Sequence, residues 1–194
     1  MDHPSAICVY SSSKDEVASV YKDSAIELGK LLADKNISLV YGGGDKGLMG
    51  LIAHSCMDAG GKVIGFMPTH LQGIEKPDLD ITEFYFVESM HERKQKMFER
   101  ADAFFILPGG FGTLDEVFEM ITWRQIGLHE KPIIFININH YWDPVKLLAD
   151  NIISQKFASE THRTYFFFAN SVGEAFGILK GLPKPSHAAC AEWM

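Results

Sequence analysis

Seven short apolar runs alternate along this chain with segments of helical periodicity. Such alternation predicts a parallel sheet covered by helices, because consecutive parallel strands need a crossover connection. We therefore expect an α/β protein with a Rossmann-like doubly wound parallel sheet, flanked by helices on both faces. The expected strands are residues 6–10, 38–41, 62–67, 84–87, 103–107, 132–136 and 165–168, the last of them a buried strand.

The size and composition of the chain fit one such domain. With 194 residues, 46% of them hydrophobic, the chain can bury a full core. We expect a single nucleotide-binding domain over residues 1–182 and a flexible polar tail over residues 183–194. The formal net charge of −7 argues against binding to nucleic acids or anionic membranes, which usually requires a basic face.

Cysteine usage and hydropathy predict where such a protein works. The three cysteines stand far apart and form no CxxC pair, so they predict neither a zinc site nor a disulfide framework. The first residues lack a basic segment followed by a long apolar run. No run approaches the roughly 18 apolar residues of a membrane span. We therefore expect a cytoplasmic protein.

The segment from Pro108 to Glu116 carries the strongest functional signal. It joins the apolar run 103–107 to a helical pattern that includes residues 117–121. Glycines at such a junction let a ligand approach the backbone, and the free N–H groups at a helix start bind anions, phosphate above all. The carboxylate of Glu116 could then act on the group that carries the phosphate.

A purely structural role for Glu116 fits the same spacing. Thr113 and Glu116 match a capping box, in which the threonine hydroxyl accepts from one free N–H and the glutamate accepts from another. A cap needs at most one glycine, whereas this turn has glycine at positions 109, 110 and 112. The three glycines favour a bound phosphate or sugar, while both interpretations of Glu116 stay open.

A second glycine cluster follows the expected strand 38–41. Gly42, Gly44 and Gly47 match the G-x-G-x-x-G pattern of dinucleotide-binding proteins. That function also requires an acidic residue at the end of the next strand, where this chain has Phe66-Met67-Pro68. The Walker pattern fails as well, since no G-K-[ST] is present. The sequence thus disfavours NAD, and we expect no cofactor.

Arg93 and Lys94 flank the apolar stripe of a helix expected over residues 90–101. Cations at the margin of a buried face usually extend to water or pair with a carboxylate. Because this helix precedes the strand that feeds the glycine-rich turn, a guanidinium here could instead bind phosphate or reach Glu116. The scattered histidines show no spacing typical of a metal site, so we assign no metal; they include residues 54, 70, 91, 129 and 140.

Together and in this order, the three motifs resemble the LONELY GUY (LOG) family. The resemblance covers roughly residues 5–180, and the triple motif is far more specific than any single glycine pattern. The residues that carry it are Tyr41–Gly44 with Gly47–Gly50, then Met90–Lys94, then Pro108–Thr113 with Glu116, extended by Thr122-Trp123 and Gln125–His129.

The resemblance implies a Rossmann-like homodimer that acts on a small molecule. Its substrate would be a purine nucleoside 5′-monophosphate, either AMP or a cytokinin riboside 5′-monophosphate. Hydrolysis of the N-glycosidic bond would release the free base and ribose 5-phosphate. Family members are often labelled lysine decarboxylases, but this chain shows no signal for the Schiff-base lysine that pyridoxal chemistry needs.

Residue roles also follow from the resemblance. Arg93 and Glu116 would be catalytic. The substrate-binding residues would be Ser13, Gly43, Gly44, Lys94, Gly109, Gly110, Phe111, Gly112, Thr113 and Thr122.

The chain departs from the family pattern in two places. Ser12 stands where the loop after the first strand usually has glycine, and the loop 68–82 has His70 near the place of a usual acidic residue. These departures bear on the preferred base more than on the reaction. A non-catalytic nucleotide sensor or carrier of the same fold is the alternative, because it would use the same glycines. Only an enzyme requires Glu116 opposite a cation.

Overall fold

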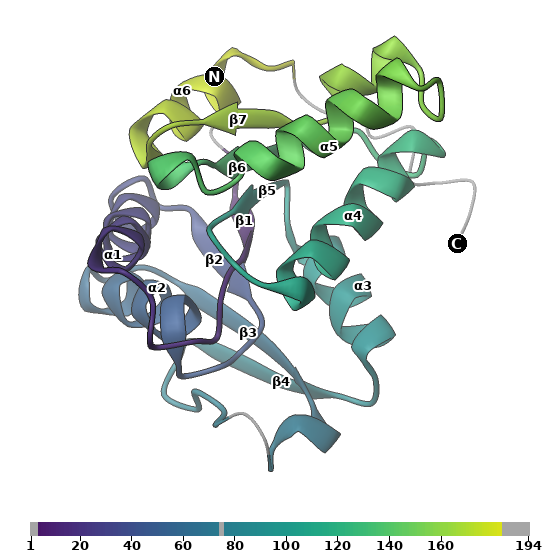
Figure 1. The fold of residues 1–194 in the computed structure, drawn as a ribbon. Helices are drawn as coiled ribbons and strands as arrows, with labels where there is room; N and C mark the ends of the chain where they lie inside the picture. Colours follow the sequence, from purple (N-terminus) through teal and green to yellow (C-terminus); the bar gives the residue numbers. More distant parts are fainter. Residues whose placement is uncertain (1–3, 74–75, 184–194) are drawn as a thin grey trace.

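A computed structural model describes residues 4–73 and 76–183 and confirms the Rossmann-like fold (Figure 1). Its seven strands are β1 (Ala6–Tyr10), β2 (Ser38–Tyr41), β3 (Val63–Pro68), β4 (Glu83–Val87), β5 (Ala103–Ile106), β6 (Ile133–Ile136) and β7 (Phe167–Ala169). They form one sheet in the order β4-β3-β2-β1-β5-β6-β7, and every pair of neighbours runs parallel.

Helices cover both faces of this sheet (Figure 1). One face carries α1 (Ser19–Asp34), α2 (Gly47–Asp58) and α6 (Val172–Gly181), and the other carries α3 (Met90–Arg100), α4 (Phe111–Gln125) and α5 (Asp143–Ser154). Short 3₁₀ helices are η1 (Thr69–Leu71), η2 (Ile138–His140) and η3 (Glu160–Thr164). Within the described part of the chain, no helix has the length and apolar character that crossing a membrane requires.

The apolar runs are continuous because the central strands are buried on both faces. Successive side chains of a strand point to opposite faces. Ile7 and Val9 of β1 pack against α1, α2 and α6, whereas Cys8 and Tyr10 pack in the second core with α3, α4 and α5. Two hydrophobic layers therefore meet at one strand, which fixes the register of the centre of the sheet.

Two elements differ from the sequence prediction, and a third expectation falls outside the described residues. The last strand is Phe167–Ala169 rather than 165–168, and its phenylalanines are only half buried because β7 is an edge strand. The helix expected around residues 117–121 begins earlier, at Phe111. The expected tail lies outside the described residues from position 184 onward.

His129 joins the end of α4 to the segment that leads into β6. Its buried ring accepts from the Lys131 N–H at Nδ1 (3.1 Å) and contacts the Met120 carbonyl at Nε2 (2.9 Å), which places the proton on Nε2. Burial lowers the pKa of His129 to about 4, and the charges of Lys131 and Arg124 act in the same direction. The ring is therefore neutral in the folded protein at neutral pH.

This neutral histidine predicts a loss of stability in mild acid. The unfolded chain binds a proton at His129 below about pH 6.5, whereas the folded chain does so only near pH 4. The free energy of unfolding should therefore fall with pH across this window, by up to about 3 kcal/mol from this residue. Urea unfolding curves measured at several pH values test this.

His129→Gln is the matched control. Glutamine has no acceptor at the position of Nδ1, where the Lys131 N–H donates, so we expect the variant to cost about 1–3 kcal/mol at pH 7 and to show a shallower decline below pH 6.5. An identical pH dependence in both proteins would contradict the assignment.

Candidate active site

The candidate site lies where the order of the sheet reverses, between β1 and β5. Two loops meet there, at the carboxyl ends of these strands. The Ser12 N–H donates to the Pro108 carbonyl (3.2 Å), and the Thr113 hydroxyl donates to the Ser11 carbonyl (3.2 Å). Open α/β sheets bind ligands in the crevice at such a reversal. The fold therefore places the glycine-rich turn at the expected binding position.

The start of α4 has no side-chain cap. Gly110 is its N-cap residue, and no side chain of the residues that the structure describes accepts a hydrogen bond there. Thr113 lies inside the first turn and uses its hydroxyl on Ser11, so the capping-box interpretation of Thr113 and Glu116 is wrong. The first N–H groups of a helix lack partners within the helix and carry a partial positive charge. This helix start can therefore bind an anion.

Two of the three glycines in the turn have no packing role in the protein alone. A Cβ on Gly109 would lie 2.1 Å from the Thr113 hydroxyl oxygen, so packing requires that glycine. In the described part of the chain, a Cβ on Gly110 or Gly112 would meet nothing within 4 Å beyond its own neighbours. The Tyr141 hydroxyl fixes the turn by donating to the Gly109 carbonyl (2.7 Å). The space beside Gly110 and Gly112 is open to a ligand.

Arg93 and Glu116, both buried, face each other across the site. Arg93 Nη2 donates to the Gly42 carbonyl (3.2 Å) and lies 3.9 Å from Glu116 Oε1. Among the described residues, Arg93 Nε has no hydrogen-bond partner, nor does the buried hydroxyl of Ser11. The structure thus brings together the two residues expected to be catalytic, with donor capacity left on the guanidinium.

Lys94 holds α3 against α4. Its buried ammonium lies 3.1 Å from Asp115 Oδ2 and 2.9 Å from Glu119 Oε2, two carboxylates one helical turn apart. Burial lowers the pKa of Lys94, but the two carboxylates outweigh burial and leave it raised. Lys94 therefore contacts α4 rather than open space, and it neutralises Asp115 near the anion site. The spacing of Asp115 and Glu119 was the signal for this pairing that the sequence argument missed.

The second glycine cluster positions Arg93 at the site formed by the first. A Cβ on Gly42 would lie 1.8 Å from Arg93 Nη2, so only glycine lets the guanidinium reach this carbonyl. Gly43 has a φ of 76°, a conformation that favours glycine. Its carbonyl accepts from the Asp78 N–H (3.0 Å), and Gly44 forms a bridge with Pro77. Gly43 and Gly44 thus contact residues 77–78, and their role toward a substrate stays a prediction.

The start of α2 is closed by the chain itself. The Leu48 and Met49 N–H groups donate to the Ser12 carbonyl, at 2.9 and 3.3 Å, and the Gly47 N–H donates to Asp15 Oδ1 (2.8 Å). Ser12 therefore fits its loop without being glycine. A Cβ on Gly47 would lie 2.4 Å from the backbone of Ser13. The helix start that a dinucleotide would need is occupied, and Ser13 lies beside it.

Two expected residues lie on the outside of α4. Phe111, the first residue of the helix, is 91% exposed. Thr122 is exposed near the other end of α4, where its hydroxyl donates to the Phe118 carbonyl (2.8 Å). Thr122 follows Phe111 by eleven positions, so the two lie roughly 16 Å apart along the helix axis. One chain therefore does not bring Thr122 to the start of α4.

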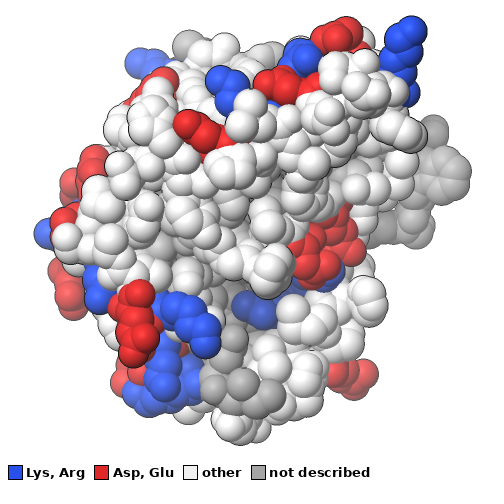
Figure 2. Space-filling model, in the orientation of Figure 1, with Lys and Arg blue, Asp and Glu red and all other residues white. Residues whose placement is uncertain are grey.

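The surface of the molecule shows how charged side chains gather near the start of α4. Figure 2 shows a hollow below the start of α4, with basic side chains inside it and acidic side chains at its margin. A cationic hollow beside carboxylates suits a ligand that joins an anionic group to a centre that becomes positive during reaction.

Comparisons with known sequences agree on one family. The sequence model described as "Possible lysine decarboxylase" matches residues 49–179. The cytokinin riboside 5′-monophosphate phosphoribohydrolase LOG of Oryza sativa subsp. japonica is 44% identical over 168 residues, which are 87% of this chain and 69% of the relative. LOG3 of Arabidopsis thaliana, with the same enzyme name, is 40% identical over 186 residues, 96% of this chain and 84% of the relative.

Solved structures share the fold at lower identity. The molybdenum cofactor carrier protein of Chlamydomonas reinhardtii superimposes with a TM-score of 0.69 at 20% identity, over 92% of this chain and 98% of the carrier. The molybdenum cofactor binding protein of Rippkaea orientalis gives 0.70 at 19% identity, over 92% and 97%. These likenesses show the fold alone, whereas the sequence matches extend over most of the chain, and the protein belongs to the LOG family.

Proposed function

We propose that this protein hydrolyses the N-glycosidic bond of a purine nucleoside 5′-monophosphate, cytokinin riboside 5′-monophosphate or AMP. The products are the free base and ribose 5-phosphate. One observation carries the proposal: the buried Arg93 and Glu116 face each other next to the uncapped start of α4. The relatives named phosphoribohydrolases support the same reaction. We expect the enzyme to act in the cytoplasm, and this stays a prediction.

Binding of the phosphate positions the sugar. The N–H groups at the start of α4 donate to the phosphate oxygens in the open space beside Gly110 and Gly112. The ribose then extends along α4, which directs its anomeric carbon toward Glu116 in the second turn. Fixing both ends of the ribose in this way lowers the entropic part of the barrier.

The chemical step develops positive charge on the ribose. As the bond from C1′ to the base nitrogen breaks, the electron pair leaves with the base, and the ribose becomes oxocarbenium-like. The Glu116 carboxylate stabilises that charge and takes a proton from the attacking water, whose oxygen bonds to C1′. The departing base gains one proton from the solvent, and Glu116 then releases to the solvent the proton that it took from water. Arg93 offsets the charge of Glu116 and offers its remaining N–H groups to the phosphate.

A carrier of the same fold is the second candidate, because the molybdenum cofactor carrier has this architecture. A carrier needs the anion site but has no use for a buried carboxylate beside it, since a second negative charge weakens anion binding. The assay that separates the two measures free base and ribose 5-phosphate after incubation with AMP and with its isopentenyl analogue. Equal release of both products supports the enzyme, and stoichiometric binding without release supports the carrier.

Glu116→Gln should separate binding from turnover. The amide keeps the size of the side chain but cannot stabilise positive charge or accept the proton. We expect kcat to fall by about 100-fold or more, with the affinity for AMP changed only a few-fold. Release of ribose 5-phosphate and calorimetric binding of AMP measure the two quantities.

The control is Glu99→Gln, on the solvated side of α3, where Glu99 contacts Gln95 and Lys96. This variant should turn over like the wild type. Undiminished turnover by Glu116→Gln would refute the catalytic role.

Gly112→Ala should weaken ligand binding without destabilising the fold. Outside its own helical turn, its Cβ would meet no atom of the described residues within 4 Å, and alanine favours a helix over glycine by up to about 1 kcal/mol. We expect the Tm to stay equal or rise, while KM rises about 10-fold or more because the methyl group enters the phosphate site.

Gly173→Ala is matched in position, since Gly173 is likewise the second residue of a helix and has open space around it. It should stabilise α6 without changing KM. Equal KM values for the two variants would mean that no ligand approaches Gly112.

We also propose that two copies of the chain associate through α4 and α5. Large apolar side chains are exposed on and beside these neighbouring helices, which is typical of interfaces. They are Phe111, Ile126, Leu147, Leu148 and Phe157, exposed by 91%, 63%, 68%, 47% and 85%. A partner docked on α4 would also give the exposed Thr122 a route to a site in the other subunit.

Light scattering after gel filtration tests the assembly. We expect the wild type at twice the mass of one chain, and Leu147→Glu at a lower average mass because a buried, unpaired charge disfavours association. A wild type of single mass at micromolar concentration would contradict this proposal while leaving the hydrolytic one intact.

A further inference from the structure

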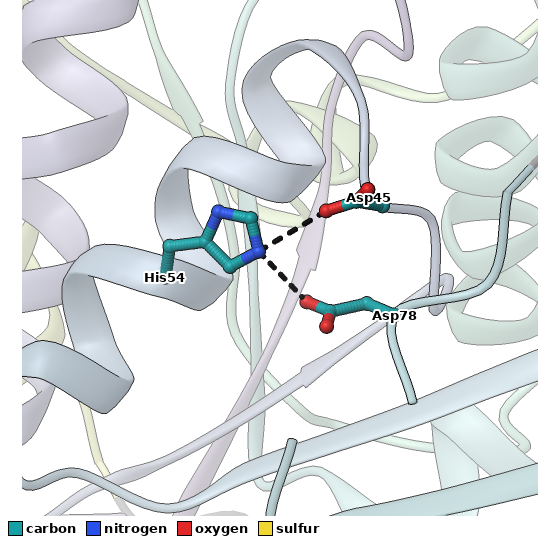
Figure 3. Close-up of side chains that lie close together, drawn as sticks. All are labelled: Asp45, His54 and Asp78. Carbon is teal, nitrogen blue, oxygen red and sulfur yellow. Dashed lines mark ion pairs between the residues drawn. The ribbon is translucent and has the colours of Figure 1, made fainter. Parts of the chain in front are cut away.

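A separate cluster of polar side chains lies beside α2 and the glycine-rich turn before it. Asp45 comes from the turn itself, His54 from the middle of α2, and Asp78 from the segment between η1 and β4 (Figure 3). His54 Nε2 lies 3.2 Å from Asp45 Oδ1 and 3.2 Å from Asp78 Oδ2. A turn, the helix that follows it and a later loop thus direct one nitrogen and two carboxylate oxygens to the same point.

One proton cannot satisfy both contacts. An imidazole Nε2 carries a single hydrogen, so it donates to one carboxylate at a time. A cation between the three atoms would be bound by all of them. Ligand atoms that share a transition metal at 2.0–2.2 Å lie about 3.0–3.5 Å apart. The two 3.2 Å separations match that spacing, and the three ligand atoms all lie within 4.8 Å of one another.

Further contacts hold the ligands in place without the help of an ion. Lys76 Nζ donates to Asp45 Oδ2 (2.5 Å), and the Tyr41 hydroxyl donates to Asp78 Oδ2 (3.3 Å). The Asp45 N–H donates to the Lys76 carbonyl (3.1 Å). Such outer contacts typically orient the ligands of a metal site.

We propose that Asp45, His54 and Asp78 bind one divalent transition-metal ion. A set of one imidazole and two carboxylates suits Mn²⁺ or Zn²⁺. The His54 side chain is 52% exposed, so water can complete the coordination. This ion fastens the segment around Asp78 to the glycine turn that supports Arg93. It plays a structural part, and the inference is independent of the hydrolytic reaction.

Mn²⁺ is the probe for this site, because it prefers oxygen and nitrogen ligands to thiolates and so avoids the cysteines. The full chain, stripped with a chelator, is titrated while electron paramagnetic resonance measures free Mn²⁺. We expect saturation at one ion per chain. His54→Gln and Asp78→Asn should each weaken binding by about 10-fold or more. His140→Gln is the control, since His140 faces a single carboxylate, that of Asp143 (3.2 Å), and should bind like the wild type.

A second measurement needs no variant. Pulsed resonance on the wild type with bound Mn²⁺ should show coupling to an imidazole nitrogen. Three results would overturn the proposal: no saturable binding up to about 1 mM Mn²⁺, a bound ion without nitrogen coupling, or folded variants at His54 and Asp78 that bind as tightly as the wild type.

Discussion

The uncapped start of α4 is the constraint on which the rest of the site depends. A helix leaves its first N–H groups without internal partners, and here no side chain within residues 4–73 and 76–183 supplies a cap. The topology places this helix start at the reversal between β1 and β5, where loops from both strands meet. The contrast with α2 is instructive, because the chain closes that helix start with the Ser12 carbonyl and Asp15. Only one of the two glycine-rich turns is therefore built to receive an anion.

The charged residues around α4 divide into two groups with different tasks. Lys94 lies between Asp115 and Glu119 and fixes the rotation of α4 about its axis. Glu116, between these carboxylates in sequence, then faces Arg93 instead. Because Asp115 is neutralised by Lys94, a single carboxylate faces the ligand. Arg93, Lys94 and Glu116 are buried, and a buried charge that loses its partner is costly.

The sequence was sufficient for the architecture, and it singled out Arg93 and Glu116, which the structure brings together. Runs such as 6–10 and 103–107 predicted strands because they are apolar on both faces, and the glycine-rich turn predicted an anion site through the chemistry of a helix start. Local sequence patterns failed where a contact with another segment determines the role of a side chain. Thr113 matched a capping box, but the Ser11 carbonyl takes its hydroxyl. The cluster of Asp45, His54 and Asp78 comes from three segments, so no spacing along the chain could predict it. Thr122 is exposed near the far end of α4, so its role toward a substrate stays a prediction.

The central claim is that the phosphate sits on the start of α4 while the anomeric carbon faces residue 116. A crystal structure of the Glu116→Gln variant with AMP bound tests it most directly. The account predicts phosphate oxygens within hydrogen-bond distance of the N–H groups of residues 111–113, and C1′ as the ribose atom next to the side chain at position 116. A phosphate bound at the start of α2, or a ribose whose C1′ points away from residue 116, would contradict it.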